Sequence, residues 1–419
     1  MEKKEVKKEE KEKKVRNRNK NDKNMHEKNV FNIQEVVIIM IVTAICSITM
    51  TIKVTFVNNN SSQKIKTEAE LSELIDVYNS IKKEYYKEVD KKELVDSAIE
   101  GMLDYLDDPY TVLLNEVESD NLNKELDGKY VGLGAEIASS DGSFIVNKVY
   151  DNSPAMVAGM KEKDIITKIR NDSLSGVDIN DLAGKLKAKN GDKVPITVKR
   201  NGVEIVLNVT IGNVEIQSVS YKVVKNNNKN IASISIKTFA KNTFEQFKKV
   251  CDNFEKDNID GIIIDLRGNT GGHLTVSQSI AELFLNKNDI IYKLSNKNGV
   301  TEVKNVKNKK VNKPVVLIVN GQTASASEIL TAALKENINA EVVGIKTYGK
   351  GKVQKIQKLS NGLTVKYTVQ NWLTPSGKEI DKNGIEPTIE EKMNDEYNQN
   401  PIIENDNQYK KALEIISNK

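Results

Sequence analysis

The stretch PVVLIVNGQTASASEILTAALK, residues 314–335, decides the fold class. It begins with an unbroken apolar run, Val315 to Val319, which is typical of a strand buried on both faces of a sheet. After a short loop, a helical sequence begins at Ser325. A buried strand that leads directly into a helix is typical of an α/β domain.

The same alternation continues on the N-terminal side of this stretch. Residues 242–256 form an amphipathic pattern at helical spacing, and residues 261–266 form a second short apolar run. We therefore predict an α/β domain at residues 213–392, followed by a C-terminal tail with a short helix at residues 393–419.

Two further regions precede the α/β domain. Residues 127–212 contain short strands separated by glycine turns, among them Asn201-Gly202, a strong hairpin signal. This pattern predicts a small, mostly-β domain. In residues 67–126, apolar residues recur at helical spacing and predict two helices, closed by Asp107-Asp108-Pro109. Such a pair either packs on the next domain or pairs with a second copy of the chain.

A membrane anchor is expected near the N-terminus. Residues 36–52 carry no charge, and about 17 apolar residues is the lower limit for a helix that spans a bilayer. The tail at residues 1–30 is rich in Lys and Arg, and positive flanks stay in the cytoplasm. We predict a cytoplasmic charged tail at 1–30, an uncleaved transmembrane anchor at 31–57 and a linker at 58–66, with the rest of the chain outside the cytoplasm. The alternative is a buried helix of a soluble domain.

Composition excludes several function classes. The net charge is +4 with 29% charged residues, which does not suit a dedicated nucleic-acid-binding protein. The chain has two cysteines, Cys46 and Cys251, and two histidines, His26 and His273. Four such residues, so widely scattered, argue against a zinc site and a disulfide framework. We expect no metal and no cofactor.

Ser325 is a candidate nucleophile. It lies at the entrance of the predicted helix, where free backbone N–H groups and the helix dipole stabilise negative charge. The N–H of Ala326 would then be an oxyanion donor. The alternative is a structural N-cap, because Ser325 and Glu328 also match a capping box.

The usual triad needs a histidine as the base for the serine. His26 precedes the predicted anchor and is out of reach, so only His273 is left. A lysine can serve when burial lowers its pKa. Lys350 stands between two glycines, which allow close backbone approach, and Gln354 points to the same face four residues later. The alternative is a surface lysine in a loop.

A glycine turn follows the second buried strand, in the sequence DLRGNTGGH at residues 265–273. Its backbone N–H groups suit an anion, including an oxyanion. Phosphate binding is the rival interpretation, but neither phosphate-loop pattern is present. Asp265 and Arg267 are expected to form a structural ion pair.

Four segments together resemble the C-terminal processing (tail-specific) protease family, in the same order and with the same 25-residue gap from Ser325 to Lys350. They are TASASE at 323–328, TYGKG at 347–351 with Gln354, DLR at 265–267 with Gly271-Gly272, and WLTPSG at 372–377. The resemblance implies a serine endopeptidase with a crotonase/ClpP-like α/β core. It implies Ser325 as nucleophile, Lys350 as base, Gln354 as its support, and oxyanion donors at Ala326 and at Gly271 or Gly272.

The resemblance also implies that residues 127–212 are an inserted PDZ domain that binds substrates with free C-terminal tails. Its carboxylate-binding loop would comprise Tyr130, Val131, Gly132, Leu133 and Gly134. Residues 101–111 resemble the family's Leu-Asp-Pro motif, and the N-terminal helices would form a homodimer. His273 departs from the family's apolar residue, and we expect it to line the pocket for the residue before the cut.

The function predicted from the sequence is therefore a membrane-anchored serine endopeptidase that cleaves exported proteins. A non-catalytic PDZ scaffold that binds the C-termini of exported or membrane proteins is the alternative. An acyl-CoA enzyme on a related fold fits poorly with an anchored, exported chain.

Overall fold

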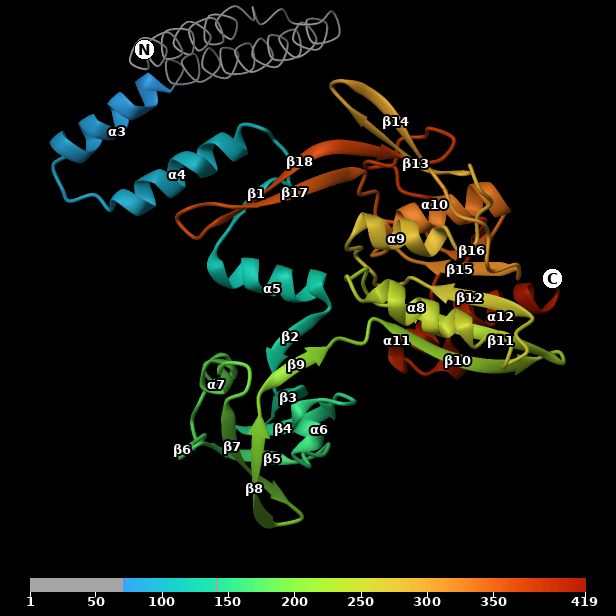
Figure 1. The fold of residues 1–419 in the computed structure, drawn as a ribbon, viewed down its shortest axis with the longest axis horizontal. Coiled ribbons are helices and arrows are strands. Elements are labelled where there is room, and N and C mark those ends of the chain that lie inside the picture. The colour runs from blue at the N-terminus through green and yellow to red at the C-terminus, as the bar shows by residue number, and fades with distance from the viewer. Residues whose placement is uncertain (1–70, 141) are drawn as a thin grey trace, which may run out of the picture. The chain divides into compact units, whose positions relative to one another are not determined.

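The computed structural model describes residues 71–140 and 142–419 (Figure 1). The predicted tail, anchor and linker at residues 1–66 lie outside this range. The chain divides into two compact units, residues 1–97 and 98–419. Within the described residues, no helix is both long enough and apolar enough to span a membrane.

The predicted α/β domain is built on a six-stranded sheet. The strand order is β10-β11-β12-β15-β16-β19, and every neighbouring pair is parallel except β10 with β11. The strands are β10 (Val219–Asn226), β11 (Lys229–Ile236), β12 (Gly261–Asp265), β15 (Val315–Val319), β16 (Glu341–Gly344) and β19 (Ile389–Glu390). The two apolar runs of the sequence are thus adjacent strands at the centre of the sheet, which confirms the α/β core.

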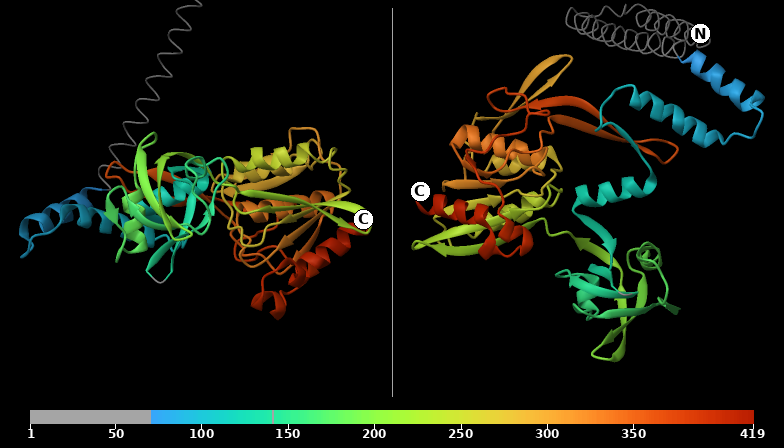
Figure 2. Two further views of the ribbon diagram at one scale, coloured as in Figure 1. Left: turned by 90° about the horizontal axis from the view of Figure 1, so that it is seen from below. Right: turned by 180° about the vertical axis from the view of Figure 1, so that it is seen from behind.

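Both faces of this sheet are covered by helices, and the left view of Figure 2 shows a layer on each side. Ile262 and Ile264 of β12 face one apolar cluster, while Ile263 faces the other. The first cluster includes residues of α8 (Thr243–Asp252), α9 (Leu274–Ala281) and α10 (Ala326–Ile338), and the second includes residues of α12 (Asn407–Ser417). The helix in the C-terminal tail is therefore part of the core. It follows α11 (Asp395–Gln399) and a short 3₁₀ helix, η1 (Ile403–Asn405).

A second sheet contains the hairpin that follows Lys350. Its order is β1-β18-β13-β14, with β17 paired to β18 on a separate branch. The strands are β1 (Val112–Leu114), β13 (Ile290–Asn296), β14 (Gly299–Lys304), β17 (Lys352–Lys358) and β18 (Thr364–Leu373). Through β1, the segment that follows the N-terminal helices joins the hairpin that follows Lys350.

The mostly-β domain has its own sheet, in the order β3-β4-β5-β7-β8 with β6 paired to β5, and its own apolar core. The chain enters it through β2 (Lys129–Gly132) and leaves through β9 (Gly212–Glu215), which pair with each other. It is therefore an insertion. Its other elements are β3 (Ala135–Ser140), β4 (Ser143–Val149), α6 (Pro154–Val157), β5 (Ile165–Ile169), β6 (Asp172–Ser173), α7 (Ile179–Leu186), β7 (Lys193–Arg200) and β8 (Val203–Thr210).

The two predicted N-terminal helices are α3 (Ser72–Glu84) and α4 (Lys91–Asp104). Neither contains a buried residue. A third helix, α5 (Glu116–Asp127), was not predicted from the sequence and leads into β2. It begins at a capping box made by Asn115 and Glu118.

Candidate active site

Three predicted site segments meet at the carboxyl ends of adjacent parallel strands. The glycine turn follows β12, Ser325 follows β15, and the loop with Lys350 follows β16. Ligands of open α/β sheets bind at this edge. The sheet thus brings together residues that are far apart in the sequence.

The backbone at Ser325 is strained. Its φ and ψ are 56° and −116°, a combination that residues with a side chain rarely adopt. Ser325 is half-buried and immediately precedes α10. Strained residues of this kind cluster at active sites, and a sharp strand-to-helix turn is how α/β-hydrolases present their serine.

The glycine turn lies directly against Ser325. A Cβ atom placed on Gly271 would be 2.9 Å from the Cβ of Ser325 and 3.2 Å from the backbone nitrogen of Ala326. A Cβ on Gly272 would be 2.5 Å from the carbonyl oxygen of Phe239. Both glycines have positive φ, 113° and 136°. Close approach and backbone conformation therefore both require glycine here.

The backbone N–H groups around Ser325 differ in what they bind. The N–H of Gly271 donates to Oδ1 of the buried Asn269 at 2.9 Å. Within the described residues, the N–H groups of Gly272 and Ala326 have no acceptor. Of the two candidate glycines, Gly272 is the one whose N–H is free to bind an oxyanion.

A buried carboxylate joins the serine loop to the lysine loop. Oε2 of Glu328 accepts the backbone N–H of Ser325 at 2.8 Å and that of Lys350 at 2.9 Å. Its Oε1 accepts the hydroxyl of Thr347 at 2.6 Å and the N–H of Gly349 at 2.7 Å. Burial raises the pKa of Glu328, and these four hydrogen bonds oppose that rise. From the sequence, Glu328 was expected only to cap the helix. An acidic residue at the start of an apolar helix was the signal that could have indicated a further role.

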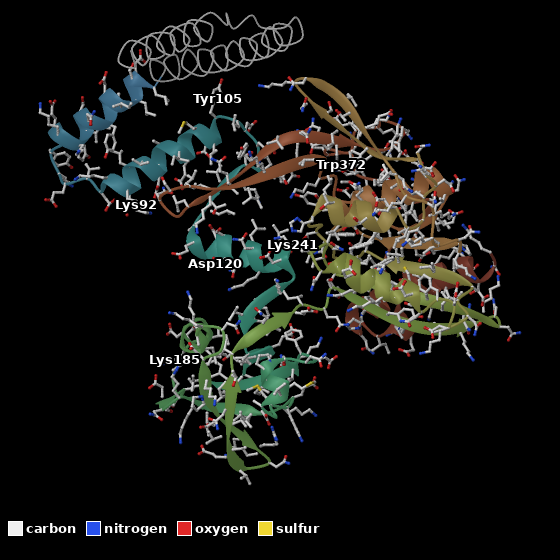
Figure 3. All side chains as sticks on the ribbon, in the orientation of Figure 1. Lys92, Tyr105, Asp120, Lys185, Lys241 and Trp372 are labelled. Atoms are coloured by element: carbon white, nitrogen blue, oxygen red, sulfur yellow. The ribbon has the colours of Figure 1, made fainter. Side chains whose placement is uncertain are left out.

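The backbone of Lys350 is held on both sides. Its N–H binds Glu328, and its carbonyl accepts Nε1–H of Trp372 at 2.8 Å. Trp372 is almost fully buried and lies at the end of β18, where Figure 3 labels it. The side chain of Lys350 points to the ring of Tyr110, with Nζ 5.0 Å from the ring centroid.

Burial lowers the pKa of Lys350, and the charge of Lys366 lowers it further. The carboxylates of Glu328 and Asp108 act in the opposite direction. A lysine with a lowered pKa provides more neutral amine near neutral pH, as a general base requires. Within residues 71–140 and 142–419, Nζ of Lys350 makes no hydrogen bond, either to Ser325 or to Gln354.

Gln354 lies on β17, and its Nε2 is 3.5 Å from Oγ1 of Thr368 on the neighbouring strand. Its side-chain nitrogen is thus directed toward β18.

His273 has a structural contact. Its Nε2 lies 3.1 Å from the carbonyl oxygen of Leu126, near the end of α5. Because a carbonyl only accepts, Nε2 must carry the proton. Burial lowers the pKa of His273 and so disfavours the charged imidazolium. This contact holds α5 near the glycine turn.

The predicted ion pair of Asp265 and Arg267 is present, with Nη2 and Oδ2 2.6 Å apart. Arg267 also binds Asp406 at 2.8 Å and thereby fixes the N-terminus of α12 to the end of β12. This confirms a structural role for the pair.

In the mostly-β domain, the predicted carboxylate-binding residues surround the entry strand. Tyr130, Val131 and Gly132 belong to β2, and Leu133 and Gly134 connect it to β3. Within the described residues, the N–H groups of Leu133 and Gly134 have no acceptor. The adjacent strand β3 is an edge of its sheet. An edge strand next to free N–H groups suits a peptide that ends in a carboxylate.

Comparison with family models gives three matches. Residues 230–391 match peptidase family S41, residues 131–211 match a PDZ domain, and residues 38–117 match the activating protease CtpB N-terminal domain.

Curated relatives cover most of the chain. The carboxy-terminal processing protease CtpA of Bacillus subtilis (strain 168) is 35% identical over 379 residues, which are 89% of this chain and 80% of that protein. CtpB of the same organism is 36% identical over 81% of this chain and 71% of its own length. A probable CtpA-like serine protease of Staphylococcus haemolyticus (strain JCSC1435) is 31% identical over 83% of this chain and 70% of its own length. The chain therefore belongs to the carboxy-terminal processing proteases, serine proteases of peptidase family S41 that carry a PDZ domain.

Proposed function

We propose that this protein is a membrane-anchored endopeptidase that cleaves exported proteins, with Ser325 as nucleophile and Lys350 as general base. The observation that supports it most strongly is the Glu328 carboxylate, which binds the backbone of both residues through one oxygen atom. The strained backbone of Ser325 and the lowered pKa of Lys350 are independent support.

The proposed reaction has two steps. In the first, the neutral amine of Lys350 takes the hydroxyl proton of Ser325 while Oγ bonds to the scissile carbonyl carbon. The ammonium then protonates the leaving nitrogen, and the C–N bond breaks to give an acyl-enzyme. In the second step, Lys350 takes a proton from water, whose oxygen bonds to the ester carbon. The ammonium then gives this proton to Oγ as the C–Oγ bond breaks, which releases the acid product and restores Ser325 and Lys350. The hydrogen bond between Nζ and Oγ has to form on substrate binding, as is common for catalytic pairs in unliganded enzymes.

The oxyanion of each tetrahedral intermediate would bind the N–H groups of Ala326 and Gly272. Neither N–H has an acceptor in the described residues, and Gly271 contacts Ser325 directly. Each such donor typically contributes about 10²–10³ in rate. Gln354 would accept a hydrogen bond from the amine and thereby direct it toward Ser325.

Substrate tails would bind the PDZ domain through their C-terminal carboxylate. The free N–H groups of Leu133 and Gly134 would hold the carboxylate, and the tail would add as a strand to β3.

Attachment to the membrane would be through residues 31–57, with the catalytic part outside the cytoplasm. The support is the uncharged run at 36–52 and its positive N-terminal flank. The test is alkaline extraction of membranes that contain the full chain or a chain without residues 31–57. The full chain should stay in the pellet and the deleted chain should be extracted; release of both would contradict the anchor.

The nucleophile is tested with the purified full chain and an unfolded protein substrate. We expect Ser325→Ala to abolish cleavage with little change in thermal unfolding, and Ser220→Ala, an exposed control on β10, to be fully active. A fluorophosphonate probe should label Ser325, as mapped by peptide mass spectrometry. Cleavage by Ser325→Ala at the normal rate would contradict the assignment. Failure of the natural chain to cleave, together with tight binding of C-terminal peptides, would favour the scaffold function.

A further inference from the structure

We propose that the turn Asp108–Thr111 positions the catalytic base, with Tyr110 placing and shielding the amine of Lys350 and Asp108 setting the orientation of the Gln354 amide. The inference rests on the proposed function, because it takes Lys350 as the base. Nothing in the sequence alone connects this turn to Lys350.

The first observation is the contact between Tyr110 and Lys350. Nζ lies 5.0 Å from the ring centroid, within the range of attraction between a cation and an aromatic ring. Neighbouring groups contact Tyr110 at its backbone and at its hydroxyl. The backbone N–H of Tyr110 donates to Oδ1 of Asp108 at 3.1 Å. Burial and the neighbouring hydroxyl of Tyr348, which is two residues before Lys350, raise the pKa of Tyr110 to about 12. Tyr110 therefore defines where the amine rests.

The turn is anchored to the second sheet. The hydroxyl of Thr111 donates to Oδ2 of Asp108 at 2.7 Å and accepts the backbone N–H of Thr368 at 3.1 Å. Thr111 is buried, and β1 continues from it as a partner of β18. The position of the Tyr110 ring is thus coupled to the strand that also pairs with β17.

The second observation is a chain of hydrogen bonds from Asp108 to Gln354. The hydroxyl of Thr368 lies 3.5 Å from Nε2 of Gln354, and as a neighbouring hydrogen-bond donor it also lowers the pKa of Asp108. An ionised carboxylate only accepts, so Thr368 must donate its single proton to Asp108. Thr368 can then only accept from Gln354, which places the amide nitrogen toward Thr368. The amide oxygen is left to accept a hydrogen bond from the amine of Lys350.

The third observation is a cavity of about 370 Å³ that Tyr110 helps to line. Residues 106–111 line it together with Lys352, Thr368, Asp381 and Lys382. Lys350 does not line it. The charged lining favours water, and the ring of Tyr110 separates that water from the amine. Loss of the ring would hydrate the amine and make its charged form easier to maintain.

Tyr110 and Asp108 have opposite effects on the pKa of Lys350, and therefore on the pH profile of activity. Lys350 faces Lys366 of β18, Glu328 of α10 and Asp108 of the turn, while Tyr110 faces Tyr348, Asp381 and Glu328. Removal of the ring hydrates the amine and raises the pKa of Lys350, because burial is the largest cause of its lowered pKa; the lost attraction between cation and ring acts the other way and is the smaller effect. Removal of the Asp108 charge lowers it, because a nearby carboxylate favours the ammonium form.

The test is the pH dependence of kcat and kcat/KM for the full chain acting on an unfolded protein. Tyr110→Ala should lower kcat at pH 7 about tenfold and move the acid limb about one unit to higher pH. Tyr110→Phe keeps the ring and should stay within about threefold of the natural chain, with an unmoved limb. Tyr105→Ala, an exposed control labelled in Figure 3, should change neither value.

Asp108→Asn is the complementary variant. Its amide can donate to Thr368, which frees the threonine proton for the oxygen of Gln354 and turns the amide nitrogen toward Lys350. We expect a fall in kcat with little change in KM, and an acid limb moved to lower pH. A merely structural defect would not move the two limbs in opposite directions.

Several outcomes overturn the inference. If Tyr110→Ala keeps the natural acid limb, or if Tyr110→Phe loses as much activity as Tyr110→Ala, the ring does not position the base. If circular dichroism shows that Tyr110→Ala does not fold, Tyr110→Leu replaces it. An acid limb of Tyr110→Leu at the same pH as that of the natural chain would likewise show that the ring does not position the base. Lys350→Ala in the same assay separates the two proposals. Full activity of Lys350→Ala would overturn the proposed function. An inactive Lys350→Ala, together with a Tyr110→Ala variant whose acid limb is not shifted, would overturn only the role of the turn.

Discussion

Oε2 of Glu328 lies 2.9 Å from the backbone nitrogen of Lys350 and accepts its N–H. The same oxygen accepts the N–H of Ser325 at 2.8 Å, so one buried atom holds the loops that follow β15 and β16. All four hydrogen bonds of this carboxylate come from groups that donate to it. Glu328 therefore acts as a clamp between the proposed nucleophile and the proposed base, and it does not need to touch the substrate.

Glu328→Gln tests this clamp. The amide nitrogen of Gln would face N–H donors and leave two of them unsatisfied, at a cost of about 1–3 kcal/mol each in the free energy of unfolding. Misplacement of the catalytic loops should lower kcat about 100-fold. Denaturant unfolding and steady-state cleavage measure both effects. Glu245→Gln, exposed on α8, is the matched control. Unchanged kcat in Glu328→Gln would show that the clamp is dispensable.

Lys366→Met tests the electrostatic lowering of the Lys350 pKa. The proposed mechanism requires the neutral amine, so activity should rise with pH as Lys350 loses its proton. Burial and Lys366 place this transition below the ordinary lysine value of 10.5. Removal of the Lys366 charge makes the ammonium easier to maintain, raises the pKa and moves the acid limb by up to about one unit to higher pH. The measurement is kcat/KM against pH, with Lys355→Met, exposed on β17, as control. A limb that moves to lower pH would contradict this account.

Arg267→Ala tests the attachment of α12 to the sheet. The change leaves the carboxylates of Asp265 and Asp406 without their cation, and Asp406 is almost fully buried. We expect the free energy of unfolding to fall by about 3 kcal/mol, because unpaired buried charges are strongly destabilising. Lys411→Ala breaks a more exposed pair with Glu414 and should cost less than about 1 kcal/mol. Equal effects of the two changes on urea unfolding would contradict the buried role of Arg267.

Tail binding by the PDZ domain is tested with two labelled peptides that differ only at the C-terminus. A free carboxylate can accept the N–H groups of Leu133 and Gly134, whereas a terminal amide presents one oxygen and no charge. We expect amidation to weaken binding to Ser325→Ala protein about tenfold or more, as measured by fluorescence anisotropy. Equal affinities would mean that the tail is bound elsewhere or by its side chains alone.

The sequence was sufficient to predict the α/β core and the inserted PDZ domain, and the structure brings the three predicted site segments to one edge of the central sheet. Val315–Val319 and residues 261–266 are apolar without interruption, and such runs form central strands. Since parallel strands end at one edge, Ser325 and the glycine turn had to lie near each other. The hydroxyl-rich motif and the glycine-flanked lysine then indicated the chemistry.

Contacts between distant side chains could not be predicted in this way. Glu328 binds the loop of a residue 22 positions later, and His273 binds Leu126, 147 positions earlier. The contact of Tyr110 with Lys350 depends on how β1 pairs with β18. Local periodicity carries no information on such pairings, because they depend on the packing of the whole domain. The helix α12 was predicted, but its burial under the sheet was not.

The central claim is that an amine and not an imidazole activates Ser325. The most direct measurement is cleavage of an unfolded protein by Lys350→Ala and His273→Ala, each compared with the natural chain and with the control Lys355→Ala. We predict that Lys350→Ala is inactive although it is folded, and that His273→Ala, which loses a contact with Leu126, keeps at least part of its activity. An active Lys350→Ala together with an inactive, folded His273→Ala would contradict the account.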